Sequence, residues 1–408
     1  MFRKVSFAFY AAVALLFGTP CLGTDDKTSD KEFMPEWQKG YLDIHTVATV
    51  KGDCSFVMMP DGTTMLIDAG EVGPNWPLPQ PNPSKTAAEW IVKYIRDFAK
   101  RDTVDYLYIT HLHGDHIGVE AQVVGHAHGY GLCGVTRVGE DIHFNRIIDR
   151  ACPDYAEPIS DEPFVKDYIK YALYQRDSCG TKLEQFQIGS KKQIALQYDR
   201  KSFRKDFEVY NLAANGYVYN GKGKGTTYMY PVPPTKHDEN MYSCVFLMRY
   251  GDFTYYNGGD LGGGPGVSNK YRDGEKWVAD LIGQHVTMIK PDHHGYAESS
   301  NGYFLKVLSP ELIVIPSSHV IHPHYKALSR LTDEMSYVGP RQIYVTNDGC
   351  KERIENNAPG LWDKVIQYHG HVVVRVYEGG TSYQVFVLDN VIPDYHVLYK
   401  SDIIEIKK

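Results

Sequence analysis

The chain has 408 residues, of which 43% are apolar, and a formal net charge of −7 at pH 7. This length and apolar content are sufficient for a large buried core in one or two domains. So acidic a chain is not a general nucleic-acid coat protein, because phosphate binding depends on a basic surface.

The first 23 residues have the layout of a secretory signal peptide. A basic start, Met1–Lys4, precedes the apolar run Val5–Gly18 and a small, turn-prone segment that ends at Gly23. The apolar run is too short to span a membrane comfortably. We therefore expect a secreted or periplasmic protein with no transmembrane span in the mature chain. Lipid attachment at Cys21 is an alternative, which Pro20 disfavours.

Residues 24–40 are polar and predict a flexible leader. Three apolar runs between residues 41 and 68 then predict a β-meander, with Asp61-Gly62 as a hairpin turn. The capping box Thr86-x-x-Glu89 predicts the start of a helix with one apolar face. Residues 104–110 predict a short buried strand after this helix.

The same order of elements returns in the second half of the chain. A strand pair is predicted on either side of residues 250–252, and helix–strand units follow up to residue 316. Two last strands join across Gly379-Gly380, and residues 391–408 are expected to form a C-terminal tail. This alternation predicts two mixed β-sheets packed face to face, with helices outside.

Residues 119–241 interrupt the pattern and predict an insertion with a helix over residues 164–175. Within it, residues 181–224 carry nine Lys or Arg residues against four acids. Such a stretch is typical of a solvated surface. It also offers Lys201, Arg204 and Lys205 as candidates that attract an anionic substrate.

Residues 110–118 read Thr-His-Leu-His-Gly-Asp-His-Ile-Gly and directly follow a predicted buried strand. His111, His113, Asp115 and His116 thereby place four metal-competent side chains within six residues. A strand end holds its last side chains rigidly, and the following turn lets alternate residues converge. Imidazole and carboxylate donors at this spacing suit zinc, and manganese or iron less decisively.

This motif resembles the His-x-His-x-Asp-His signature of the metallo-β-lactamase superfamily, and Asp68 in Ile-Asp-Ala-Gly resembles the first motif of that superfamily. Other motifs look more specifically like the soluble domain of the DNA-uptake competence protein ComEC. Secreted phosphorylcholine esterases are similar in the same elements. The resemblance covers residues 41–120 and 240–390. Its later motifs are Ser243-Cys244-Val245-Phe246, Gly259-Asp260, His293-His294-Gly295 and His322-Pro323.

The resemblance implies an α/β fold over residues 41–390, namely the αββα metallo-β-lactamase sandwich of two mixed sheets with an insertion. It also implies two divalent metal ions, zinc most readily and manganese as an alternative, with Asp260 as the bridge between them. His293 is an alternative to His294, since adjacent residues on an extended segment face opposite ways. The expected ligands besides Asp260 are His111, His113 and His294 for the first ion, and Asp115, His116 and His322 for the second.

Two aspartates have further expected roles. Asp115 is expected to orient the attacking hydroxide or to take its proton. Asp68 is expected to hydrogen-bond a ligand histidine and fix its orientation. Many superfamily members have another ligand histidine before the bridging aspartate. If His294 or His322 lay far away, a one-metal site or one of four histidines in the insertion would be the better interpretation. These four are His126, His128, His143 and His237.

Together these features predict a secreted metal-dependent hydrolase, most readily a phosphodiesterase or nuclease-like enzyme that uses a dimetal-bound hydroxide. The expected substrate is an anionic ester, such as a phosphodiester in nucleic acid or a phosphocholine compound. Lys201, Arg204, Lys205 and His324 are the expected substrate-binding residues. Two alternatives stay open at this point. The same centre could hydrolyse carboxylic esters, lactones or β-lactams, or the chain could be a non-catalytic, metal-containing binding protein.

Overall fold

A computed structural model of the chain describes residues 31–73, 81–119, 128–155, 158–230, 238–262, 273–317 and 321–407. One compact unit begins at Phe33 and continues to the C-terminus. The expected signal peptide and the alternative lipid attachment at Cys21 lie outside the described residues, as do His126 and His237. No helix within the described ranges is long and apolar enough to cross a membrane.

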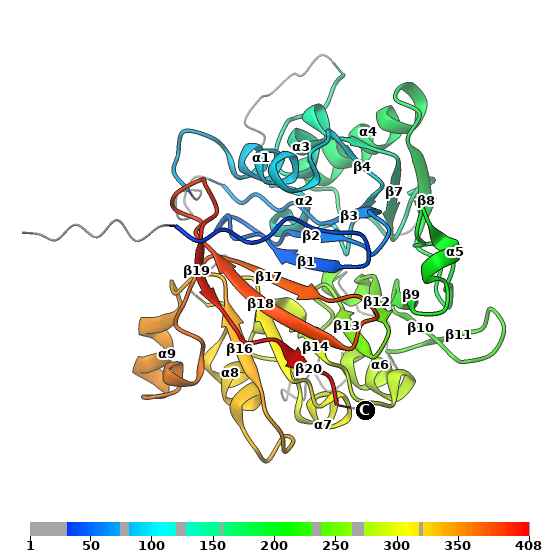
Figure 1. The fold of residues 1–408 in the computed structure, drawn as a ribbon. Coiled ribbons are helices and arrows are strands. Elements are labelled where there is room, and N and C mark those ends of the chain that lie inside the picture. Colours follow the sequence, from blue (N-terminus) through cyan, green and yellow to red (C-terminus); the bar gives the residue numbers. More distant parts are fainter. Residues whose placement is uncertain are drawn as a thin grey trace, which may run out of the picture. The chain divides into compact units, whose positions relative to one another are not determined.

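One β-sheet combines strands from both ends of this unit (Figure 1). Its strands follow the order β19-β18-β17-β1-β2-β3-β5-β7-β8, and β20 pairs with β18. The expected meander is present as β1, β2 and β3, which pair antiparallel, whereas β3, β5, β7 and β8 are parallel. The bounds are Leu42–Thr46 for β1, Ser55–Met58 for β2, Thr64–Ile67 for β3, Tyr106–Tyr108 for β5, Arg146–Asp149 for β7, Lys182–Gln185 for β8, His371–Val376 for β17, Ser382–Leu388 for β18, Val397–Lys400 for β19 and Ile404–Glu405 for β20.

The second sheet comes from the middle and later parts of the chain. Its order is β11-β10-β9-β12-β13-β14-β15-β16, and the strands from β13 to β16 are parallel. The bounds are Phe207–Ala214 for β9, Tyr217–Tyr219 for β10, Thr226–Tyr228 for β11, Val245–Tyr250 for β12, Phe253–Asn257 for β13, Met288–Lys290 for β14, Leu312–Ile315 for β15 and Gln342–Val345 for β16. A separate parallel pair joins β4 (Thr103–Val104) to β6 (His143–Phe144).

The inner faces of the two sheets share one apolar core. Val57 and Tyr108 of the first sheet and Phe246 and Tyr255 of the second belong to the same buried cluster. The rings of Tyr108 and Phe246 meet edge to face, with centroids 5.3 Å apart. Burial of these side chains from water is the main force that holds the sheets together.

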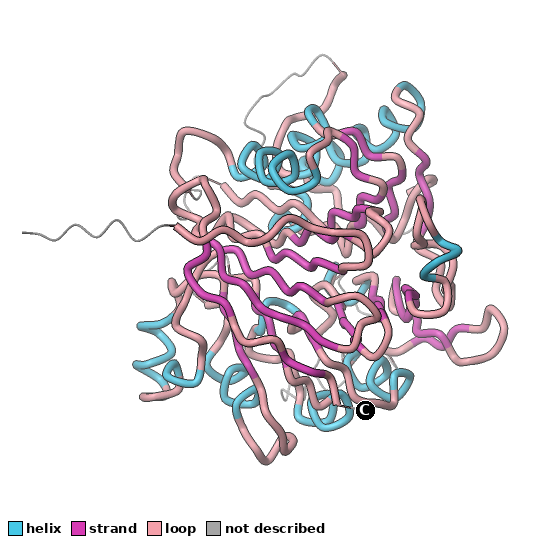
Figure 2. Tube along the Cα trace, viewed as in Figure 1, coloured by secondary structure: helices cyan, strands magenta, loops and turns pink. Residues whose placement is uncertain are grey.

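Helices cover the outer faces of both sheets, as Figure 2 shows. The predicted α/β class and the αββα arrangement of two mixed sheets are therefore confirmed. The bounds of the longer helices are Ala87–Ala99 for α1, Val135–Asp141 for α3 and Pro163–Ser178 for α4 against the first sheet, and Gly274–Ile282 for α6, Gly302–Leu308 for α7, Tyr325–Thr332 for α8 and Lys351–Asn357 for α9 in the later part of the chain. Short turns of helix are α2 (Gly114–Ile117), α5 (Arg200–Phe203), η1 (Glu239–Tyr242), η2 (Asp292–Gly295) and η3 (Trp362–Lys364).

The start of helix α1 and its buried face follow from the local sequence. Thr86 accepts a hydrogen bond from the Glu89 amide, and the Glu89 carboxylate accepts one from the Thr86 amide, which completes the predicted capping box. Trp90, Ile91 and Tyr94 lie on the buried face, as their spacing predicts.

The stretch between residues 119 and 241 contributes strands to both sheets. Here β7 and β8 extend the first sheet beyond β5, while β9, β10 and β11 extend the second sheet beyond β12. The C-terminal tail expected over residues 391–408 likewise supplies β19 and β20, which pair with β18. Hydrophobic alternation in these short strands was too weak to indicate their place in the sheets.

Candidate metal centre

The ends of parallel strands bring the candidate residues to one edge of the sandwich. Asp68 follows β3 and His111 lies just after β5, and these strands run parallel in the first sheet. Asp260 follows β13 and His294 follows β14, which are parallel in the second sheet. The Cys244 amide donates to the Thr110 carbonyl at 2.8 Å and so joins the two edges. Residues far apart in the sequence therefore meet.

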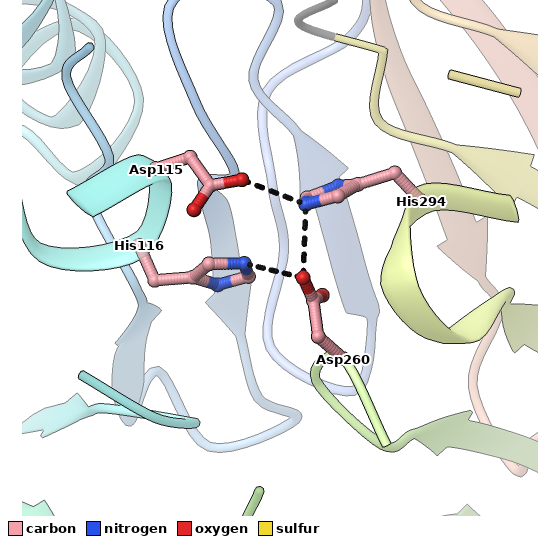
Figure 3. A group of neighbouring side chains, drawn as sticks. All are labelled: Asp115, His116, Asp260 and His294. Atoms are coloured by element: carbon pink, nitrogen blue, oxygen red, sulfur yellow. Dashed lines mark ion pairs between the residues drawn. The ribbon is translucent and has the colours of Figure 1, made fainter. Parts of the chain in front are cut away.

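Asp115, His116, Asp260 and His294 form a group of metal-competent donors whose ligand atoms all lie within 4.8 Å of one another (Figure 3). Asp260 Oδ2 lies 3.2 Å from His116 Nε2 and 3.4 Å from His294 Nε2. Asp115 Oδ2 lies 3.4 Å from the same His294 nitrogen. These separations match the spacing of about 3.3 Å expected between neighbouring donors of a tetrahedral ion whose bonds are about 2.0–2.1 Å long.

Burial of donor atoms without partners supports the fit of a cation. His116 and His294 are fully buried, and Asp260 is 1% exposed. Within the described part of the chain, His116 Nε2 and both ring nitrogens of His294 have no hydrogen-bond partner. Buried polar atoms of this kind are costly unless something satisfies them. A divalent cation fits imidazole nitrogens and carboxylate oxygens in this arrangement.

Carboxylates dominate the electrostatics of the cluster. Burial by itself lowers the pKa of His116, but Asp260, Asp68 and Asp115 raise that pKa well above its ordinary value. For His294, burial is again outweighed by Asp260 and Asp115, and the pKa rises to about 9. Both shifts report a negative field that stabilises positive charge at the cluster.

His111 also faces the same aspartate, and His113 lies next to His111. His111 Nε2 lies 3.9 Å from Asp260 Oδ2 and 3.1 Å from His113 Nδ1. His111 is fully buried, whereas His113 is half-buried. The side chain of Asp260 therefore faces imidazoles from the 111–116 segment and from the loop after β14.

The loop after β14 differs from the extended segment that the sequence suggested. His293 and His294 both have positive φ, at 49° and 51°. Because the backbone is left-handed at both positions, the two neighbouring rings do not alternate. His293 Nε2 lies 3.9 Å from Asp260 Oδ2, while its Nδ1 lies 3.0 Å from Glu298 Oε1. Such backbone strain clusters at functional sites.

The grouping of donors also differs from the expected division. We expected His294 to lie with His111 and His113, but its Nε2 lies next to Asp115 and Asp260. His322 stacks on His294 with ring centroids 5.0 Å apart. The His322 ring also lies 5.7 Å from that of His293, so His322 borders the cluster beside both histidines.

Asp68 lies behind the cluster and holds His116 in place. Its Oδ2 lies 2.8 Å from His116 Nδ1 and accepts a hydrogen bond from Thr110 Oγ1 at 2.7 Å. The Thr110 amide donates to the other oxygen at 2.9 Å. With Nδ1 engaged in this way, His116 directs Nε2 toward Asp260, which is how an outer carboxylate orients an imidazole.

Helix α2 needs close backbone contact to present Asp115 and His116. The Asp53 amide donates to the Asp115 carbonyl at 2.8 Å, and the Ala69 amide donates to the His116 carbonyl at 3.0 Å. A Cβ atom at Gly70 would lie 1.7 Å from the Asp115 carbonyl oxygen. Only glycine leaves room for α2 at this position.

Two charged residues of the centre were missed from the sequence. Lys290 ends β14, and its Nζ lies 3.0 Å from Asp53 Oδ2 and 3.7 Å from Asp260 Oδ1. Both Lys290 and Asp53 are buried. The available signal was a lysine at the end of an otherwise apolar strand, just before the two histidines, since lysine is rarely buried without a partner.

The structure does not bring Lys201, Arg204 and Lys205 to the cluster. The adjacent Asp199 amide donates to Asp61, which precedes β3, whereas Asp68 follows that strand. The Lys205 carbonyl accepts a hydrogen bond from Arg249 near the end of β12. By contrast, Ser243 lies before β12, and its Oγ accepts a hydrogen bond from the Asp260 amide.

These contacts place the basic residues at the edge opposite the cluster, because β3 and β12 separate the two ends by whole strand lengths. Composition revealed the basic stretch, but its position follows from the path of the chain between β8 and β9.

Of the remaining candidate histidines that the structure describes, one lies near the cluster and two lie elsewhere. His324 lies beside Tyr296 at 5.9 Å between ring centroids, and Tyr296 lies 4.9 Å from His293. The ring of Tyr296 therefore lies between His324 and His293. His128 stacks on Tyr174 of α4, and His143 begins β6.

Comparison with known proteins yields similarity only to solved structures. No family model and no curated protein matches this sequence. The metallo-β-lactamase fold protein YhfI from Bacillus subtilis is 11% identical, with a TM-score of 0.40, and the match covers 74% of this chain and 96% of that chain. CmlA, a diiron β-hydroxylase from Streptomyces venezuelae, is 13% identical, with a TM-score of 0.40 and coverage of 84% and 55%.

A diphosphatase from the PhnP family is 10% identical, with a TM-score of 0.34 and coverage of 82% of this chain and 97% of that chain. Identities and scores this low carry no assignment of activity to this chain. We therefore base the function on the residues of the centre.

Replacement of Gly70 by alanine tests the contact between α2 and the meander. We expect Gly70→Ala to lower the free energy of unfolding by about 1–3 kcal/mol, as overpacking does. The matched control is Gly302→Ala, where no atom lies within 4 Å of the added Cβ. Urea unfolding followed by circular dichroism measures both variants. Equal stability of the two variants would contradict the close approach.

Proposed function

We propose that this protein is a secreted, metal-dependent hydrolase of ester bonds that holds two divalent ions, zinc most readily and manganese as an alternative. The observation that supports this proposal best is the group of imidazole and carboxylate donors around Asp260 Oδ2, in which buried nitrogens of His116 and His294 lack a hydrogen-bond partner. We assign Asp115, His116 and His294 to one ion and His111 and His113 to the other, with Asp260 shared. His293 and His322 are further donors at the same edge.

The ions would lower the pKa of bound water and polarise the ester group. Among the carboxylates of the centre, Asp115 is suited to accept a proton from the attacking water, because its side chain is 27% exposed while that of Asp260 is buried. Burial raises the pKa of Asp115, but His116 and His294 bring it well below its ordinary value. Asp115 is therefore ionised, as an acceptor of a proton must be.

His293 is placed to contact a substrate. Its side chain is 20% exposed, and Glu298 engages Nδ1, so that Nε2 faces the centre. Tyr296 lies beside His293, His324 lies beside Tyr296, and both are half-buried. We propose that these three residues line the approach to the ester.

The charge of the centre favours an anionic ester. The carboxylates of Asp53, Asp68, Asp115 and Asp260 supply four negative charges, and the ammonium of Lys290 supplies one positive charge. Two divalent ions held by this set would offset its negative charge and could bind the charged oxygens of a phosphodiester directly. We therefore propose a phosphodiester substrate, in agreement with the ComEC-type resemblance. The alternative carboxylic esters, lactones and β-lactams lack the phosphodiester charge at the reacting group.

A substrate panel with metal analysis tests this proposal. Purified protein is expected to carry about two ions per chain and to hydrolyse bis(p-nitrophenyl) phosphate in preference to a neutral lactone. Chelation and His113→Ala should each abolish the activity, because both remove the means to activate water. Activity that survives both treatments would contradict the proposed centre. Less than one bound ion per chain would favour a non-catalytic binding protein.

The role of Asp68 is tested through metal affinity. We expect Asp68→Asn to weaken metal binding by about 10- to 100-fold, the usual effect of removing a group that orients a ligand. Titration calorimetry with Zn²⁺ measures this change. Asp105→Asn is the matched control, because Asp105 is also buried and accepts a hydrogen bond from Thr64. Equal affinities in the two variants would show that Asp68 does not orient His116.

The position of the basic stretch leads to a further prediction. The triple variant Lys201→Ala, Arg204→Ala, Lys205→Ala should keep kcat/KM for the phosphodiester within about twofold, because exposed charges at the opposite edge are screened over such distances. Kinetics at physiological ionic strength measure the effect. A tenfold loss of kcat/KM would show that these residues contribute to substrate binding.

A further inference from the structure

Lys290 is an unusual residue for its position. It is the last residue of β14, a strand between two parallel neighbours, and it is 3% exposed. It stands in register with Asn257 of β13, three residues before Asp260. Its ammonium donates to the Gly259 carbonyl at 2.8 Å. A buried lysine is rare unless its charge is paired, so this ammonium needs an explanation.

The ammonium links the two sheets beside the cluster. Lys290 belongs to the second sheet, whereas Asp53 belongs to the loop between β1 and β2 of the first sheet. Their charged groups lie 3.0 Å apart. The backbone of Asp53 in turn contacts the Asp115 carbonyl. Lys290 therefore connects the strand before His294 with the helix that carries Asp115.

The two oxygens of Asp260 have different surroundings. Oδ2 faces His116 Nε2 at 3.2 Å and His294 Nε2 at 3.4 Å. Oδ1 faces the Lys290 ammonium at 3.7 Å. A freely turning carboxylate could present either oxygen, or both, to the histidines. The ammonium makes the two orientations unequal, because it attracts Oδ1 to its own side.

We propose that Lys290 is a positioning residue that holds Asp260 so that Oδ2 alone is shared between the two metal ions. The proposal rests on the proposed function, because it concerns the same ions. It assigns to Lys290 a task distinct from binding a metal, since an ammonium has no lone pair for coordination.

The ammonium is paired at this buried position with two carboxylates, that of Asp53 at 3.0 Å and that of Asp260 at 3.7 Å. A neutral side chain of similar length would remove the attraction on Oδ1 while filling the same space. Removal of Lys290 alone would leave Asp53 buried without its partner, which is strongly destabilising.

The experiment therefore neutralises the pair. The variant Asp53→Asn, Lys290→Met is compared with the wild-type protein after loading with Mn²⁺. The matched control is Asp43→Asn, Arg375→Met, which neutralises another buried ion pair, 2.6 Å long, between β1 and β17. Electron paramagnetic resonance shows whether two Mn²⁺ ions are exchange-coupled through a shared oxygen. Titration gives the apparent Kd for Mn²⁺, and thermal unfolding reports stability.

We expect the Asp53–Lys290 variant to lose the exchange-coupled signal and to bind Mn²⁺ about 10- to 100-fold more weakly. The Asp43–Arg375 control should keep the wild-type signal and Kd, even if it unfolds at a lower temperature. A coupled signal and a Kd equal to wild type in the Asp53–Lys290 variant would overturn the positioning role of Lys290 but not the proposed function. Wild-type protein that binds no Mn²⁺ or Zn²⁺ would overturn the proposed function as well.

Discussion

The convergence of buried imidazole nitrogens on one carboxylate oxygen, Oδ2 of Asp260, is the constraint on which the centre depends. His116 and His294 approach this oxygen at 3.2 and 3.4 Å, and His111 and His293 at 3.9 Å. The Nε2 nitrogens of His116 and His294 have no hydrogen-bond partner among the described residues. Buried polar atoms without partners are costly, and a bound ligand would offset that cost. Because the carboxylates create a negative field, the ligand that fits this position is a cation.

The rest of the fold holds these groups at the required separation. Parallel strands in each sheet end at one edge and present Asp68 and His111 from one side and Asp260 and His294 from the other. The supporting contacts are made by buried groups, including Asp68 behind His116 and the main chain of Asp53 against α2. Preorganisation of this kind keeps donors in place before any ion or substrate arrives. The strand ends, which are anchored in the apolar core, therefore hold the donor side chains in place at this edge.

The sequence predicted what depends on local patterns. The segment from His111 to His116 carries its donors within six residues, and the capping box at Thr86 specifies a helix start by itself. The left-handed backbone at His293 and His294 could not be predicted, because non-glycine residues seldom adopt it. The pairing of Lys290 with Asp53 could not be predicted either, because it depends on how the two sheets pack against each other. The basic residues near Lys201 were visible as composition, but composition does not specify which edge they occupy.

Anomalous X-ray scattering at the zinc and manganese absorption edges, from crystals of the metal-loaded protein, tests the central claim most directly. The account predicts two anomalous peaks, each within about 2.0–2.2 Å of Asp260 Oδ2, with His116 and His294 at one peak and His111 and His113 at the other. If fully loaded crystals gave no peak at Asp260, or a single peak at another place, this result would contradict the proposed centre.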